Sequence, residues 1–100
     1  MYEHNKKNSL PYPQNLITAV GVVTLTGEKL DIMLRSGLFD KREQEVLRRY
    51  YDNNESYTVI GKSLGVSKQR IGQITGQCID KLKKRLRMES LSARFLGKAV

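Results

Sequence analysis

The stretch from Ser56 to Lys84 constrains the fold of this 100-residue chain most, because it predicts two helices joined by a tight turn. Ser56 suits the cap of the first helix, since a serine hydroxyl accepts a hydrogen bond from a free backbone N–H of the first turn. Apolar residues then recur at the helical spacings of three and four, at Tyr57, Ile60 and Leu64. Gly65 can adopt the positive φ with which many helices end.

A second, basic helix is predicted after this turn, with Ser67 as its cap. Its apolar stripe comprises Ile71, Ile74, Cys78, Ile79 and Leu82. The residues that lie largely off this stripe are Lys68, Gln69, Arg70, Gln73 and Gln77. A short helix, a glycine turn and a capped basic helix are the signature of the helix-turn-helix motif.

The charge of the chain indicates its partner. The formal net charge is +8 and the pI is about 9.8, within the range of nucleic-acid-binding domains. Residues 68–87 hold seven basic residues against one acid, Asp80, and such a surface attracts phosphate without reading sequence. Double-stranded DNA is therefore the expected partner. A membrane is not expected, because the longest apolar run, Leu16 to Leu25, is interrupted and shorter than a spanning helix.

No catalytic, metal or cofactor site is expected. Cys78 is the only cysteine and lies on the apolar stripe, so we expect a small core residue rather than a reactive thiol. His4 is the only histidine, and no metal-ligand spacing or phosphate-binding glycine loop is present in the sequence. The chain is thus expected to be a cytoplasmic protein that is not an enzyme and has no small-molecule substrate.

The expected fold is all-α, with about five helices. We expect residues 1–14 to form a flexible arm, and residues 15–100 to form one helical domain with its helix-turn-helix at 56–84. The pattern at 15–25 fits a strand or a helix that covers the core. Helices are then predicted from Thr26 to Gly37 and after a capping box of Asp40 and Glu43, with Phe39 as a hydrophobic staple. The basic helix is expected to end near Met88, and Ser90 to cap a last short helix that ends at Gly97.

The residues from Leu38 to Leu86 resemble region 4, the C-terminal promoter-recognition domain of primary bacterial sigma factors. The resemblance rests on REQEVL at 42–47, Ile60-Gly61, GVSKQRIGQI at 65–74 and KLKK at 81–84. It implies a helix-turn-helix fold of the same kind. Since 100 residues leave no room for the other sigma regions, we expect a stand-alone protein similar to phage or mobile-element regulators.

Some positions depart from the family pattern. Thr58-Val59 replaces an acidic pair, Gln69 replaces an acid, and Gly72 replaces a basic residue. The −35 preference of the family is therefore not expected to transfer. Gly72 and Gly76 are also expected to loosen the second helix, since glycine costs about 1 kcal/mol relative to alanine inside a helix.

The expected function is a sequence-specific DNA-binding transcription regulator. In this motif the first turns of the second helix face base edges, and we expect base contacts from Lys68, Gln69 and Gln73. Phosphate contacts hold a protein in place on DNA without reading its sequence. They are expected from Lys62, Ser67, Arg70, Lys81, Lys84 and Arg85.

Two alternatives remain open at this point. Region 4 of sigma factors also docks on the β-subunit flap of RNA polymerase through its first two helices, so the chain could be a sigma mimic or the target of an anti-sigma partner. Residues that could line such a groove, or simply form the core, are Leu30, Met33, Leu34, Val46 and Tyr50. The other alternative is a homodimeric regulator with residues 16–25 as its dimer surface.

Overall fold

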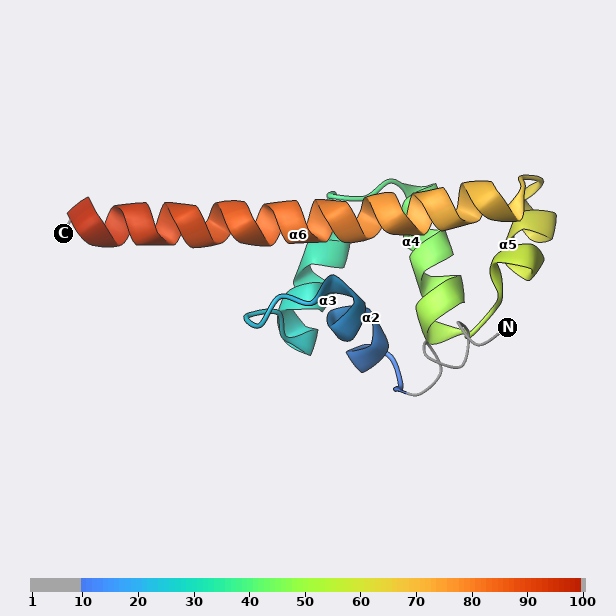
Figure 1. Ribbon diagram of the computed structural model, residues 1–100, viewed down its shortest axis with the longest axis horizontal. Helices are drawn as coiled ribbons and strands as arrows, with labels where there is room; N and C mark the ends of the chain where they lie inside the picture. Colours follow the sequence, from blue (N-terminus) through green and yellow to red (C-terminus); the bar gives the residue numbers. More distant parts are fainter. Residues whose placement is uncertain (1–9, 100) are drawn as a thin grey trace.

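The computed structural model describes the backbone of residues 10–99 and the side chains of residues 10–91. Within this range it is all-helical, which confirms the predicted fold class. The helices are α2 (Gln14–Val20), α3 (Gly27–Arg35), α4 (Lys41–Leu47), α5 (Tyr57–Leu64) and α6 (Lys68–Ala99). A π-helical segment, η1 (Arg48–Asp52), continues α4. The long helix α6 forms the axis of the molecule, and the shorter helices pack along its N-terminal half (Figure 1).

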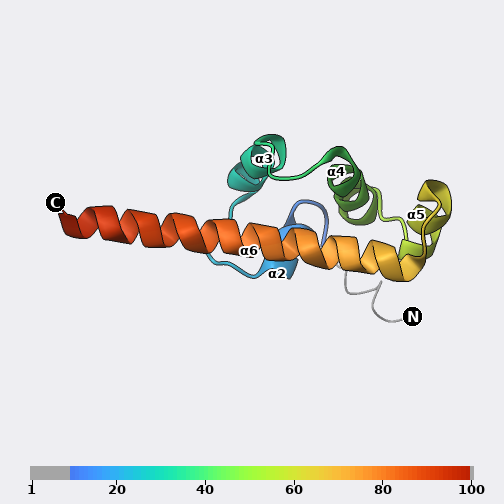
Figure 2. The ribbon, with the colours of Figure 1, turned by 90° about the horizontal axis from the view of Figure 1, so that it is seen from above.

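Helix α6 is longer than the sequence predicted. Its 32 residues form one helix, so the expected break near Met88, the cap at Ser90 and the stop at Gly97 were wrong. No proline or glycine lies between Gly76 and Gly97, and buried Leu82 and Leu86 continue the apolar stripe. The last turns of α6 extend beyond the other helices, as Figure 2 shows from above.

The N-terminal segment packs against the body of the protein from Tyr12 onward. Tyr12 is half-buried against the core, and α2 starts at Gln14, so the described end of the expected arm belongs to the folded domain. Residues 1–9, including His4, lie outside the described residues. Asn15 is buried, and its Nδ2 donates a hydrogen bond of 2.8 Å to the carbonyl oxygen of Tyr51 in η1.

The segment at 15–25 forms a helix followed by a loop. Leu16, Val20 and Leu25 are buried in the core of their own chain, so these three residues are not available as a dimer surface, whereas Ala19 in the same segment is exposed and Val22 is half-buried. Val23, in the loop, is 99% exposed. Leu16 and Val20 are buried while Thr18 between them is exposed; a strand would place all three on one face, whereas a helix places only Leu16 and Val20 together.

The predicted caps of α3 and α4 are confirmed. Thr26 Oγ1 accepts a hydrogen bond from Lys29 N at 3.1 Å, and Asp40 and Glu43 form the complete capping box. Phe39 is buried, but the residue at the staple position is Gln44, whose Nε2 donates to the carbonyl oxygen of Phe39 at 3.0 Å. The hydrophobic staple is thus replaced by a hydrogen bond.

Candidate nucleic-acid interface

The turn between α5 and α6 has the geometry expected of a helix-turn-helix motif. Gly65 adopts a φ of 74°, and the N–H of Val66 donates to the carbonyl oxygen of Gly61 at 2.9 Å. Ser56 Oγ caps α5 by accepting from Val59 N at 3.2 Å, and Ser67 Oγ caps α6 by accepting from Arg70 N at 3.1 Å. These bonds fix the first turn of α6 relative to α5.

The burial pattern of α6 defines its two faces. The buried face comprises Ile71, Ile74, Thr75, Cys78, Leu82 and Leu86. Gln69, Gln73 and Gln77 lie on the opposite, exposed face, which we call the outward face of α6. Lys68, the remaining predicted base contact, is exposed in the first turn. The three predicted base-reading residues thus all lie on accessible surface.

Arg70 is exposed and contacts one of these residues. Its Nη1 donates a hydrogen bond to Gln73 Oε1 at 3.3 Å. The side-chain amide nitrogen of Gln73 keeps its two donor hydrogens, so Gln73 can still donate to a base while Arg70 approaches a phosphate. The bond therefore orients Gln73 and leaves its donors free.

Most of the expected phosphate contacts are accessible. Lys62 on α5, Ser67 in the turn, and Lys84 and Arg85 on α6 are exposed. The Ser67 hydroxyl accepts the cap hydrogen bond and can still donate its own hydrogen.

Lys81 is the exception among the expected phosphate contacts. Its Nζ donates to both carboxylate oxygens of Glu43, at 2.9 Å and 2.8 Å, and lies 5.6 Å from the centre of the Phe39 ring. The hydrogen bond to Glu43 raises the pKa of the Lys81 ammonium. A phosphate would have to compete with this carboxylate, so Lys81 fastens α6 to α4 and is removed from the phosphate set.

Gly72 has a packing role that the sequence did not reveal. A Cβ at this position would lie 3.3 Å from Cε2 of Tyr57, whose ring stacks on Tyr50 with a centroid separation of 4.4 Å. The absence of a side chain at Gly72 lets Tyr57 pack against α6. The helix is continuous through Gly72 and Gly76, so neither glycine interrupts it.

Arg49 connects η1 to the helix-turn-helix, a link that the sequence pattern did not predict. Its Nη2 lies 2.7 Å from Glu55 Oε1, and its Nη1 donates to Ser63 Oγ at 2.9 Å. The hydrogen bond from Arg49 lowers the pKa of Glu55. Arg49 thus holds the loop before α5 and α5 itself against the end of α4. The only sign of this link in the sequence was Glu55, an acid directly before the Ser56 cap.

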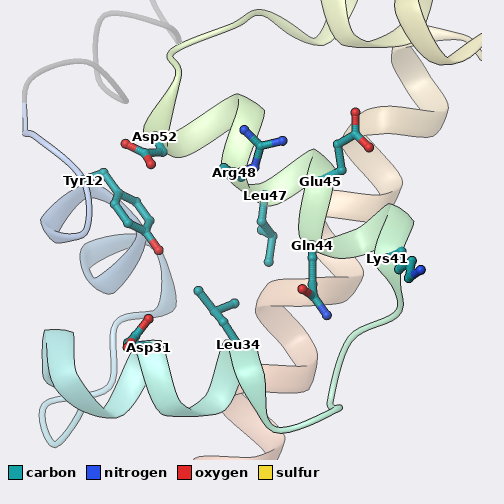
Figure 3. Close-up of a pocket in the computed structure, with 9 residues that line it drawn as sticks. All are labelled: Tyr12, Asp31, Leu34, Lys41, Gln44, Glu45, Leu47, Arg48 and Asp52. Carbon is teal, nitrogen blue, oxygen red and sulfur yellow. The ribbon is translucent and has the colours of Figure 1, made fainter.

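The residues expected for a polymerase-docking groove lie mostly in the core. Leu30, Met33 and Val46 are buried, whereas Leu34 lines a pocket between α3 and α4. In Figure 3 the side chains of Leu34 and Leu47 point toward each other across this pocket. Its rim is polar and includes Tyr12, Asp31, Lys41, Gln44, Glu45, Arg48 and Asp52.

Other kinds of site find no support in the described residues. Cys78 is a buried free thiol, and desolvation by burial raises its pKa to about 12, so it lies in the core as predicted. Among residues 10–91, no group of three His, Cys, Asp or Glu side chains could hold a metal ion. None of the helices that the structure describes combines the length and apolarity that crossing a membrane requires.

Comparison with known proteins identifies the domain. Residues 39–84 match the family described as Sigma-70, region 4, and this range holds α4, η1, α5 and the first half of α6. No curated protein and no solved structure matches the chain. The chain therefore carries a sigma region 4-like domain, as the sequence motifs indicated.

Proposed function

We propose that this chain, with its sigma region 4-like domain, is a sequence-specific DNA-binding transcription regulator that reads bases from the outward face of α6. Lys68, Gln69 and Gln73 are the proposed base contacts. Side chains of these types recognise base edges in the major groove, arginine or lysine at guanine and glutamine at adenine. The groove is wide enough to admit one helix.

The observation that carries this proposal is the contrast between the two faces of α6. Lys81, beside the buried face, is held by Glu43, whereas Gln69 and Gln73 on the outward face are exposed, and so is Lys68 in the first turn. Lys62, Ser67, Arg70, Lys84 and Arg85 are exposed around this region and are the proposed phosphate contacts. The polar side chains at the centre of this surface suit base reading, and the cations around them suit contacts with the DNA phosphates.

Selection of bound sequences from random duplex DNA, at two salt concentrations, tests the proposal. The expected result is a recovered motif, with affinity that falls as salt rises. Lys68→Ala combined with Gln73→Ala should abolish the motif and leave weak, salt-sensitive binding, whereas Lys41→Ala at the start of α4 should leave it unchanged. Salt-sensitive binding without any motif would refute sequence-specific reading.

A second candidate function is docking on RNA polymerase as a sigma mimic. The open pocket between α3 and α4 favours it, because half-buried Leu34 presents apolar surface there beside buried Leu47. On this hypothesis Leu34→Asp should abolish co-purification with core RNA polymerase and leave the DNA motif unchanged. Retention of polymerase by the variant, or no capture by the unmodified protein, would refute docking through this pocket.

A further inference from the structure

Three glutamines form one row along α6. Gln69, Gln73 and Gln77 are separated by four residues each, and all three are exposed on the outward face. With a rise of 1.5 Å per residue, neighbours in the row are about 6 Å apart along the helix axis and the row is about 12 Å long. Since base pairs are stacked about 3.4 Å apart, the row can reach bases over roughly four successive pairs.

The chemistry of the row is uniform. A glutamine side chain presents one donor and one acceptor together, the pattern that pairs with N7 and the N6 amino group of adenine. Guanine is read by arginine or lysine, and cytosine by an acid. Arg70 stands beside the row and donates to Gln73 Oε1, but an amide oxygen has two lone pairs, so Gln73 can still accept from the adenine amino group and the three glutamines share a preference for adenine.

The surroundings of the row limit which residues can face bases. Lys68 precedes the row in the first turn, and Asp80 follows one turn after Gln77 on the same exposed side. A carboxylate at Asp80 is repelled by phosphate and marks the end of the surface that can enter the groove. The cations Lys83, Lys84 and Arg85 resume beyond it.

Gly76 supports the assignment of Gln77. A Cβ at Gly76 would meet nothing within 4 Å, so no packing inside the protein requires a glycine there. Gly76 is exposed beside the row, one residue before Gln77. A position without a side chain permits the helix backbone to approach a ligand closely. This approach would bring Gln77, in the third turn of α6, within reach of a base.

We propose that Gln77 is a third glutamine that reads adenine, and that the DNA site of this protein is rich in A·T pairs where the row contacts it. This inference rests on the proposed DNA-binding function and adds to it a specificity residue and a class of site. Gln77 extends the base contacts one turn beyond Gln73.

The test uses the full-length protein and the duplex recovered by selection. Each adenine is replaced in turn by 7-deazaadenine, which lacks the N7 acceptor but keeps its base pairing. Replacement of the adenine that faces Gln77 should weaken binding by the protein about tenfold, within the range of one bidentate contact. The same replacement should cost the Gln77→Ala variant nothing further, because its contact is already lost.

Two variants separate reading from folding. Gln77→Glu should change the preferred base at one position from adenine to cytosine, since a carboxylate accepts from the cytosine amino group. Gln14→Ala, at an exposed glutamine on α2, should leave the site and the affinity unchanged. A purely structural role for Gln77 would change affinity without changing the preferred base.

The outcomes distinguish this inference from the proposed function. A recovered G·C-rich motif, or binding that no 7-deazaadenine substitution weakens, overturns adenine reading and leaves sequence-specific DNA binding intact. Recovery of no motif at all refutes both.

Discussion

A Cβ atom on Gly61 would lie 2.7 Å from the carbonyl oxygen of Val66, closer than real Cβ contacts allow. Gly61 is on α5, and Val66 is in the turn that leads into α6. The missing side chain lets the turn fold back against α5 and form the hydrogen bond from Val66 N to Gly61 O. The orientation of the outward face of α6 therefore depends on a glycine in the preceding helix.

Gly61→Ala should destabilise the protein. The backbone of the turn must move to admit the methyl group. Because the obstructing atom belongs to the backbone and not to a flexible side chain, we expect a cost in the upper part of the roughly 1–3 kcal/mol range for overpacking, above the roughly 1 kcal/mol that alanine gains as a helix former. Thermal unfolding would measure the loss. Gly76→Ala is the matched control, since its Cβ meets nothing within 4 Å, and it should raise the stability by about 1 kcal/mol. Equal effects of the two substitutions would contradict this account.

Asn15→Ala should also destabilise the fold. Asn15 Nδ2 donates to the carbonyl oxygen of Tyr51, and its loss leaves a buried acceptor unpaired, at a cost of about 1–3 kcal/mol. Urea unfolding monitored by circular dichroism would show it. The neighbouring exposed residue provides the control: Gln14→Ala should change the free energy of unfolding by less than about 0.5 kcal/mol. A neutral Asn15→Ala would show that α2 does not depend on this bond.

Lys81 and Lys84 should differ in their effect on DNA binding. Lys81 is paired with Glu43, whereas Lys84 is exposed. Lys84→Ala should therefore reduce the slope of log affinity against log salt by about 1, the amount expected for the loss of one phosphate contact. Lys81→Ala should leave that slope unchanged and lower the stability of the protein. Titrations at several salt concentrations measure both slopes. If Lys81→Ala lowered the slope as much, the Glu43 pair would have to open on DNA.

Stability should fall with rising pH above about 9. Burial raises the pKa of Cys78 from its usual 9.0 to about 12, so above pH 9 the unfolded chain releases this proton while the native state keeps it. The stabilising contribution is fully present below pH 9 and declines between 9 and 12, by at most about 1.4 kcal/mol per pH unit. Tyr51, whose pKa burial raises from 10.0 to about 12, adds to the decline above pH 10.

Cys78→Ala separates the two groups. The variant should be less stable at every pH, because a buried side chain has been shortened, but its stability should decline much less between pH 9 and 10, where only the tail of the Tyr51 titration remains. Urea unfolding at pH 8, 9 and 10 provides the comparison. A decline between pH 9 and 10 equal to that of the unmodified protein would show that Cys78 is not its source.

The local signals in the sequence were sufficient for the central motif. Caps at Thr26, Asp40, Ser56 and Ser67 and the turn at Gly65 follow from one or a few adjacent residues, and the structure confirms each. The helix-turn-helix was predictable because its cap, glycine and apolar spacing act within one turn of the chain.

The remaining features depend on contacts between distant parts of the chain. Lys81 was expected to be free to contact phosphate, because its partner, Glu43, is 38 residues away in the sequence. Ser90 was expected to cap a short last helix. A serine caps a helix only where the backbone is not yet helical, and α6 continues through Ser90. The strand-or-helix ambiguity at 15–25 is likewise resolved in the folded chain, where Leu16 and Val20 are buried and Thr18 between them is exposed.

Titration of ¹⁵N-labelled protein with duplex DNA, followed by NMR, tests the central claim most directly. The account predicts that side-chain amide signals of Gln69, Gln73 and Gln77 and backbone signals of the first turns of α6 shift, while those of Gln14 and Gln44 do not. Shifts confined to the residues between α3 and α4, or none in α6, would contradict base reading from the outward face of α6.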